Sequence, residues 1–204
     1  EKAYFGHATA FPLAESDIMR VGYGEAANAG AYQWITKRSP DYVILFSAGI
    51  IREPLLSTYR NRIINLHLGL TPYYRGSGNA FWPLVLGDPE GLGATVHLVA
   101  PELDAGNILG QARPDGLIES DGPRDVSNKN VLSGFALLVR CIRGYADGTI
   151  TPQPQKTGIG KVFRLKEYSA EAILTLKENF RNGMMKAYLR EKENRDHTYP
   201  IIER

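Results

Sequence analysis

The chain has 204 residues, with 24 Lys and Arg against 22 Asp and Glu, so its formal net charge is +2. This length suits one α/β domain with a short extension and is ample to bury a core, whereas two full domains are not expected. The near balance of charge leaves no large field for nucleic acid or anionic lipid, which excludes the usual polyanion-binding classes.

Apolar periodicity predicts alternating helices and strands after a loop-rich entry over residues 1–23. We expect helices over residues 25–37, 53–59, 79–86, 126–145 and 170–195. We expect strands over residues 41–46, 63–67, 94–99, 108–112 and 162–163. This alternation predicts a Rossmann-like α/β fold with a mostly parallel, doubly wound sheet. Residues 1–150 are then the α/β domain, and residues 151–204 are a carboxyl-terminal extension that is mainly one helix.

Three polar clusters follow apolar strands, at residues 49–52, 65–75 and 100–104. Ligands of doubly wound sheets bind at the carboxyl ends of the strands. We therefore expect these three loops to converge on one cleft.

The middle cluster contains the pair Asn65 and His67, directly after the apolar residues Ile63 and Ile64. Side chains two apart in a strand point the same way, so this pair is expected to face one cleft, with Leu66 on the opposite, packed side. A carboxamide donor beside an imidazole suits the handling of an oxyanion. Taken alone, however, an Asn-x-His pair at a strand end is more often a satisfied polar rim than a catalytic pair.

Further motifs follow this pair in order, and together they resemble the folate-dependent formyltransferase family over residues 41–111. They are Leu70-Thr71-Pro72-x-x-Arg75-Gly76, Gly93-Ala94-Thr95-Val96-His97 and Leu103-Asp104-Ala105-Gly106-Asn107-Ile108-Leu109. That family includes sugar N-formyltransferases, glycinamide ribonucleotide formyltransferase, methionyl-tRNA formyltransferase and formyltetrahydrofolate deformylase.

The resemblance implies that Asn65, His67 and Asp104 form the catalytic set, with 10-formyltetrahydrofolate as formyl donor and no metal. Asn65 is expected to donate to the oxyanion of a tetrahedral intermediate, which is worth roughly 3 to 4 kcal/mol of barrier. His67 stabilises that oxygen and takes part in proton transfer, since a nearby carboxylate favours its charged form. Asp104 tunes the histidine and, through water, accepts the amine proton.

The resemblance also implies two binding surfaces. The folate pocket is expected to be built largely by main chain, from Gly49, Ile50, Ile51, Arg52, Pro54, Val99 and Leu103. The acceptor is expected to meet a phosphate-pairing guanidinium, stacking surface and a helix start, at Tyr74, Arg75, Ser77 and Asn79.

Each single residue has a second interpretation. Asp104 by itself is an ordinary turn aspartate. Arg75 is as well suited to tying down its own loop as to binding substrate. His97 is interpreted as a strand histidine bonded to a neighbour rather than as a catalytic group.

The chain departs from the family pattern at both ends. The usual first strand, helix and second strand are not found, so we expect the structure to omit an amino-terminal segment or to fill its place with another segment or chain. At the carboxyl end there is no basic β-rich domain of the methionyl-tRNA formyltransferase kind, so transfer RNA is a poor acceptor candidate.

These features predict an N-formyltransferase that acts on an amino sugar or a nucleotide-linked amino sugar. A formyltetrahydrofolate hydrolase and a non-catalytic folate-binding protein are the alternatives. The expected partners are a small amine and folate, without nucleic acid or membrane, and a homodimer stays open. No apolar run reaches membrane-spanning length, and the single cysteine, Cys141, cannot form an internal disulfide, so the cytoplasm is the expected location.

Overall fold

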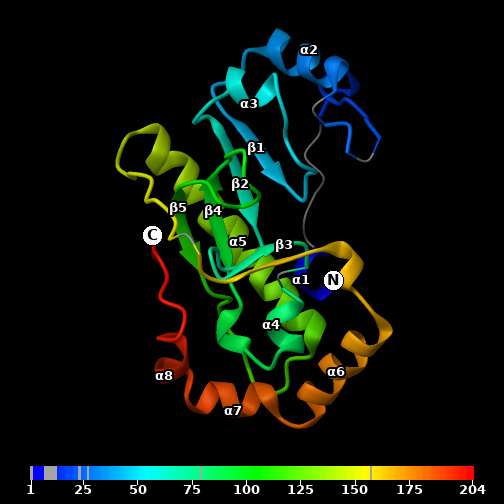
Figure 1. Ribbon diagram of the computed structural model, residues 1–204, viewed down its shortest axis with the longest axis vertical. Helices are drawn as coiled ribbons and strands as arrows, with labels where there is room; N and C mark the ends of the chain where they lie inside the picture. The colour runs from blue at the N-terminus through cyan, green and yellow to red at the C-terminus, as the bar shows by residue number, and fades with distance from the viewer. Residues whose placement is uncertain (1, 7–12, 23, 27, 79, 157) are drawn as a thin grey trace.

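The main sheet has the strand order β1 (Val43–Phe46), β2 (Ile63–His67), β4 (Ala94–Leu98) and β5 (Ile108–Ala112), as Figure 1 shows. The structure is a computed structural model, and it describes all residues except 1, 7–12, 23, 27, 79 and 157. Strands β1 and β2 are parallel, whereas β4 is antiparallel to both β2 and β5. Three strands therefore point one way, and the predicted Rossmann-like α/β fold is confirmed with a mixed sheet.

The helices and the second, smaller sheet complete the fold. The helices are α1 (Lys2–Phe5), α2 (Ala29–Arg38), α3 (Leu55–Thr58), α4 (Trp82–Val85), α5 (Pro123–Ala146), α6 (Ala170–Arg181), α7 (Met184–Arg190) and α8 (Lys192–Asp196). The second sheet pairs β3 (Tyr74–Gly76) in parallel with β6 (Lys161–Phe163). Most predicted elements are present with ends shifted by a few residues.

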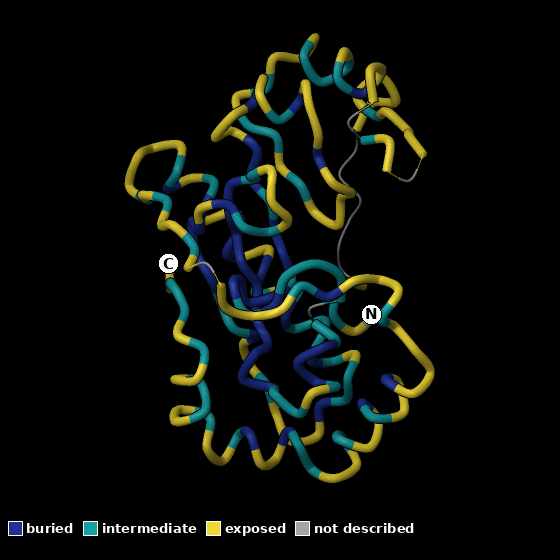
Figure 2. The backbone as a smooth tube through the Cα atoms, in the orientation of Figure 1, coloured by how far each residue is buried: buried dark blue, intermediate teal, exposed yellow. Residues whose placement is uncertain are grey.

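Helix α5 covers one face of the main sheet. Pro123 opens it, and the Asp125 carboxylate accepts from the Gly122 backbone N–H at 3.0 Å, which caps the first turn. Its buried side chains pack against Ile64 and Leu66 of β2 in the principal core. That core fills the centre of the molecule in Figure 2. Each such apolar side chain contributes roughly 1.5 to 3 kcal/mol on burial.

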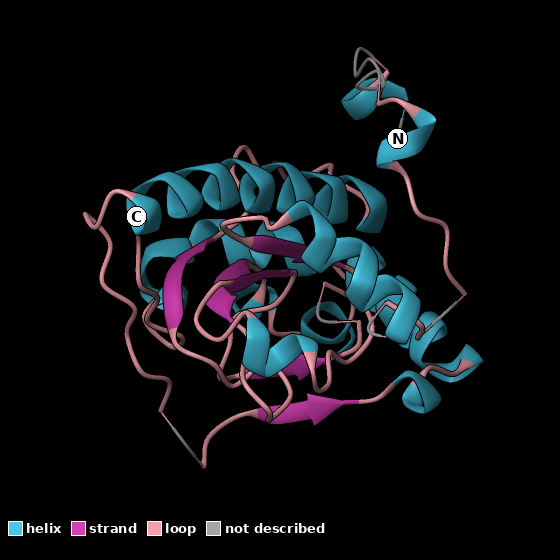
Figure 3. Cartoon of the chain, turned by 90° about the horizontal axis from the view of Figure 1, so that it is seen from above, coloured by secondary structure: helices cyan, strands magenta, loops and turns pink. Residues whose placement is uncertain are grey.

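The opposite face of the sheet receives α2 and α3. Ile63 of β2 lies in a second cluster with Leu55 and Tyr59, against which side chains of α2 pack. Seen from above in Figure 3, helices accordingly lie on either side of the strands. Alternate residues of β2 therefore point to opposite layers, which decides where its polar side chains go.

The helix predicted over residues 170–195 is three helices instead of one. Ser169 caps α6 by accepting from the Ala172 N–H at 3.1 Å. Gly183 then takes φ +78, in the left-handed region that ends a helix. The chain turns there, so that α6 packs against α4 and α7 packs against the 3₁₀ turn Pro89–Gly91, and all three helices contribute side chains to one apolar cluster (Figure 1).

Strand β3 was not predicted, because three residues in a Tyr/Arg/Gly loop carry no alternation. It forms because β6 pairs with it, and the aromatic rings add to that pairing. The Phe163 ring lies parallel to Tyr74 at 5.8 Å and to Trp82 at 5.0 Å between centroids. Residues 161–163 thus hold the loop that follows β2. The helix expected from Asn79 begins at Trp82, and Asn79 itself lies outside the described residues.

Candidate active site

Asn65 and His67 lie on the same face of β2, as predicted, and Leu66 faces the α5 core. The neighbouring strand adds a third polar side chain to that face, because His97 of β4 pairs directly with Asn65. The Asn65 Nδ2 atom is 3.1 Å from His97 Nε2. Both histidines are buried, with exposed fractions of 8% for His67 and 2% for His97.

Asp104 reaches this face by a route that the sequence interpretation had wrong. Because β4 runs antiparallel to β2, the chain leaves β4 beside the start of β2 and not beside its carboxyl end. The connection to β5 folds back along the sheet, and Asp104 takes φ +49 on the way. Gln155 holds this loop by donating to the carbonyl oxygens of Asp104 at 3.0 Å and Gly106 at 2.6 Å. The loops converge, but Asp104 reaches the site because the connection from β4 to β5 turns back along the sheet and is held there by these hydrogen bonds.

The Asp104 carboxylate joins three elements. Oδ2 lies 3.5 Å from His67 Nδ1 and accepts from the Gly76 backbone N–H at 2.9 Å. Oδ1 lies 3.5 Å from His97 Nε2. The Asp104 side chain is 10% exposed. The predicted trio of Asn65, His67 and Asp104 is therefore one polar cluster with His97 as a fourth member, in which the histidines are buried and the other two residues are partly buried.

Burial and charge act in opposite directions on this cluster. Burial raises the pKa of Asp104, but contact with His97, the charge of His67 and the Gly76 N–H outweigh it, and the pKa falls to about 2. Burial lowers the pKa of His67, and the nearby Asp104 carboxylate opposes that shift. The site therefore holds the negative charge of Asp104 beside the His67 imidazole, whose protonation is disfavoured by burial.

A second polar network supports the loop after β2. The Thr95 hydroxyl donates to the Gly69 carbonyl at 2.7 Å and accepts from the Thr71 N–H at 3.0 Å. Gln111 donates to the Thr71 carbonyl at 2.7 Å. Thr95 and Gln111 were missed as support residues, because a polar residue on a buried strand shows its partner only once the strands are paired.

The residues predicted for the folate pocket lie in two adjoining loops. Ile51 is buried in the cluster of α3, and Val99 packs against that cluster, so the two loops meet there. Two apolar side chains stay open to solvent, since Ile50 is 57% and Leu103 42% exposed. The remaining members, which are Gly49, Arg52 and Pro54, are exposed.

The residues predicted for the acceptor divide into two groups. Tyr74 is 4% exposed, and its hydroxyl donates to Asp88 at 3.0 Å, so its side chain is part of the core and does not support the prediction of substrate contact. Arg75 is partly buried, and its Nε has no hydrogen-bond partner among the described residues. Ser77 is partly buried, with its backbone N–H donating to the Phe163 carbonyl at 2.8 Å.

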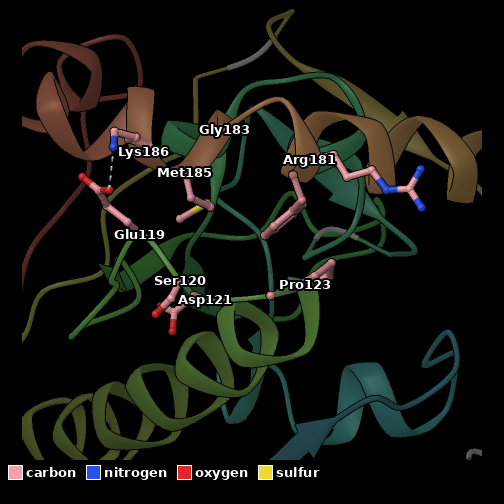
Figure 4. A pocket seen from close by; sticks show the side chains of 10 residues that line it. Glu119, Ser120, Asp121, Pro123, Arg181, Gly183, Met185 and Lys186 are labelled. Carbon is pink, nitrogen blue, oxygen red and sulfur yellow. Dashed lines mark ion pairs between the residues drawn. The ribbon is translucent and has the colours of Figure 1, made fainter.

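Elsewhere the molecule offers little competing chemistry. A hollow between residues 119–123 and the start of α7 contains Glu119 and Lys186, which pair at 3.3 Å (Figure 4). Both side chains are 55% exposed, as in an ordinary surface ion pair. Across the described part of the chain, no group of three or more His, Cys, Asp and Glu residues is placed to hold a metal ion. None of the described helices is long and apolar enough to cross a membrane.

A Rossmann-like sheet that carries an amide, two imidazoles and a carboxylate in one largely buried cluster defines an α/β protein with the groups that acid–base chemistry uses. The model of the family described as "Formyl transferase" matches residues 13–142. The chain belongs to this formyl transferase family, as its ordered motifs implied.

Curated relatives match over part of their length. Methionyl-tRNA formyltransferase of Leifsonia xyli subsp. xyli is 38% identical over 114 residues, which is 55% of this chain and 37% of the relative. That of Clostridium tetani is 32% identical over 128 residues, covering 62% of this chain and 40% of the relative. The chain thus spans about two fifths of the length of these relatives.

Solved structures share the fold at lower identity. The formyltransferase PseJ from Anoxybacillus kamchatkensis, solved with UDP-4,6-dideoxy-4-formamido-L-AltNAc and tetrahydrofolate, has a TM-score of 0.59 and 24% identity, covering 72% of this chain and 75% of that one. Phosphoribosylglycinamide formyltransferase from Anaplasma phagocytophilum has a TM-score of 0.53 and 21% identity, covering 66% of each chain. At these identities the likeness establishes the fold.

Proposed function

We propose that this protein is an N-formyltransferase that moves the formyl group of 10-formyltetrahydrofolate to the amine of an amino sugar or nucleotide-linked amino sugar. The observation that carries the proposal is the largely buried cluster of Asn65, His67 and Asp104, with 3.5 Å between His67 Nδ1 and Asp104 Oδ2. Family membership fixes the class of reaction to be tested, and the cluster supplies groups for each charge that the reaction creates.

The amine nitrogen attacks the formyl carbon, and the carbonyl oxygen becomes an oxyanion while the nitrogen becomes positive. Asn65 donates to the oxyanion. The oxyanion places a second negative charge near the His67 ring and so favours its protonation, whereas burial lowers the pKa of His67 and disfavours it. Asp104 accepts the amine proton through water. The bond from the formyl carbon to the folate nitrogen then breaks, and that nitrogen leaves with the proton, which Asp104 returns to it through water.

The two exposed apolar side chains, Ile50 and Leu103, support a planar donor at the adjoining loops. Main-chain groups there can read the amide-like edge of a pterin, while these side chains cover its face. The solved relative PseJ contains tetrahydrofolate, in line with this donor.

The acceptor side is supported by Arg75. A partly buried guanidinium with an unpaired Nε has spare donor capacity, and Arg75 directly precedes Gly76, whose backbone N–H donates to Asp104. Phosphate is the group that such a donor pairs with best. The acceptor in the PseJ structure is a nucleotide-linked sugar, whereas the curated relatives are named for methionyl-tRNA.

The test is to incubate the protein with 10-formyltetrahydrofolate and a panel of nucleotide-linked amino sugars, with methionyl-tRNA and an amine-free sample beside them. Folate absorbance and product mass are followed. Asn65→Ala is expected to lower turnover by about 10² to 10³. His67→Ala and Asp104→Asn should also lose turnover, whereas the exposed His197→Ala should retain it.

Each outcome has a distinct meaning. Transfer to a sugar amine supports the proposal, and transfer to methionyl-tRNA alone corrects the acceptor. Formate release without amine identifies a hydrolase, and folate binding without turnover identifies a binding protein. Equal turnover by wild type and all three site variants would show that the site is elsewhere.

A further inference from the structure

Gln111 of β5 lies between the loop that follows β2 and a segment much later in the chain. It is 3% exposed, and β5 is at the edge of the main sheet. Residues 202–204 run along that edge, where Glu203 pairs in parallel with Gln111 (Figure 1). The Gln111 backbone N–H donates to the Ile202 carbonyl oxygen at 2.6 Å. The later segment is therefore attached to the sheet directly at Gln111.

The partners of the Gln111 side chain determine how its carboxamide is turned. Nε2 donates to the Thr71 carbonyl oxygen at 2.7 Å, and a carbonyl oxygen can only accept. Oε1 accepts from the Ile202 backbone N–H at 3.1 Å, and a backbone N–H can only donate. Both ends of the amide are thus assigned by backbone groups, and the side chain connects Thr71 to Ile202.

The Thr95 hydroxyl completes this connection. It donates its one hydrogen to the Gly69 carbonyl oxygen at 2.7 Å, so its lone pairs accept from the Thr71 N–H at 3.0 Å and from Gln111 Nε2 at 3.1 Å. Thr71 and Thr95 are both fully buried. Water cannot readily replace a partner that is lost at such a depth, so these bonds fix the start of the loop.

The far end of the same loop meets the proposed catalytic set. The Tyr74 carbonyl oxygen lies 3.0 Å from His67 Nε2, and the Gly76 N–H donates to Asp104 Oδ2 at 2.9 Å. The two ends of the loop are tied together, because the Tyr74 N–H donates to the Leu70 carbonyl oxygen at 2.9 Å. A displacement at the start of the loop is therefore passed to both contacts with the catalytic set.

The later segment touches this loop at a second place. The Tyr199 ring lies 4.9 Å from the Tyr73 ring and 5.9 Å from the Tyr74 ring between centroids. Arg113 holds Tyr199 there by donating to its carbonyl oxygen at 2.8 Å. Residues 199–204 are thus fixed on the sheet and contact the loop on both sides of its turn.

We propose that Gln111 is a positioning residue, which holds the loop of residues 69–76 in its active geometry by connecting Thr71 to Ile202. The effect on rate rests on the proposed formyl transfer, whereas the connection does not. Arg75, on the acceptor side, belongs to this loop, and the folate residues belong to other loops. Loss of the connection should therefore impair use of the acceptor and leave folate binding intact.

The variants break the connection from either side. Gln111→Leu removes the amide, and Ile202→Pro removes the N–H that the amide oxygen accepts. Glu203→Pro is the matched control, because N–H groups of successive residues in an extended segment point to opposite sides. The N–H of the exposed Glu203 thus points away from β5, where proline is tolerated.

The kinetic test measures kcat/KM for the amine that the wild type formylates. Gln111→Leu and Ile202→Pro should each lower it by about tenfold or more, with Kd for tetrahydrofolate within about twofold. The double variant should lose no more than about twofold beyond the more severe single variant, because both changes remove one connection. Losses that multiply, wild-type kcat/KM in Ile202→Pro, or an equal loss in Glu203→Pro would overturn the proposal.

Hydrogen exchange followed by mass spectrometry tests the connection without activity. Several N–H groups of residues 69–76 are hydrogen-bonded, so the loop should exchange slowly in the wild type. In Ile202→Pro its exchange should be about tenfold faster, while α5 exchanges as in the wild type. Unchanged exchange of the loop, or equal acceleration in α5, refutes the positioning role. If no amine is formylated but exchange is as expected, the proposed function fails and the connection stands.

Discussion

Gly76 is where the loop after β2 meets the carboxylate of the site, and replacing it with alanine tests both at once. The residue has φ +87, and its N–H donates to Asp104 Oδ2 at 2.9 Å. A Cβ atom at this position would overlap the carbonyl oxygen of Phe163 in the paired strand β6. Because the obstacle is backbone, the overlap is relieved only by moving β3 away from β6.

The cost of Gly76→Ala can be built up from these contacts. A left-handed conformation costs a residue with a Cβ atom roughly 1 to 2 kcal/mol. Separating β3 from β6 weakens the 2.8 Å bond from the Ser77 N–H to the Phe163 carbonyl, which is worth about 1 kcal/mol. Losing the charge-assisted bond to Asp104 adds roughly 1.5 to 3 kcal/mol. We therefore expect destabilisation of about 4 kcal/mol together with a loss of formyl transfer.

Gly87→Ala is the matched control, because Gly87 has φ +75 with no neighbouring atom in the way of a Cβ. It should cost roughly 1 to 2 kcal/mol and leave transfer intact. Urea unfolding of both variants at pH 7, followed by tryptophan fluorescence, measures the difference. Equal unfolding midpoints for the two variants, or full activity of Gly76→Ala, would refute the reasoning.

Three further predictions concern charge, core and thiol. Asp104 has a folded pKa of about 2 against an ordinary 3.8, so its charge stabilises the fold by about 2 kcal/mol above pH 4 and ceases to do so as pH falls to 2. Urea midpoints of Asp104→Asn and wild type should therefore differ at pH 6 and converge in that acid window. Leu109→Ala, at a fully buried position, should cost about 2 to 5 kcal/mol in the same assay, against about 0.5 for the exposed Leu165→Ala. Burial raises the pKa of Cys141 to about 11, so a thiol-specific reagent at pH 8 should label it only after unfolding.

The predicted elements that the structure confirms have strong local signals. The strand over residues 63–67 was placed within its observed bounds, because a run of apolar side chains ends there in alternating polar ones. The same alternation put Asn65 and His67 on one face. Helix α2 was expected over residues 25–37 and begins four residues later, after Asn28, whose side chain accepts from the Ala31 N–H at 2.8 Å, so this local cap was missed.

The features that escaped prediction depend on partners distant in sequence. Strand β3 exists because β6 lies beside it, and Gln155 contacts Asp104 across 51 residues of chain. His97 was interpreted as a histidine bonded to a neighbour, which it is, but the identity of that neighbour required the register of β2 and β4. Periodicity within one strand determines which face each side chain takes, but not which residue of the neighbouring strand lies opposite it, so these contacts could not be predicted from it.

Because β3 pairs with β6, the residues that shape the acceptor loop are separate from those of the proposed catalytic cluster. This separation bears on how such proteins diversify. In the proposed function the chemistry rests on side chains of β2 and of the loop after β4, while the loop that would meet the acceptor takes its shape from residues 161–163 and the aromatic rings around them. Substitutions in the later part of the chain can therefore reshape the acceptor side without touching a catalytic side chain. This arrangement lets selection, or an engineer, change what is formylated while leaving the formylating apparatus as it is.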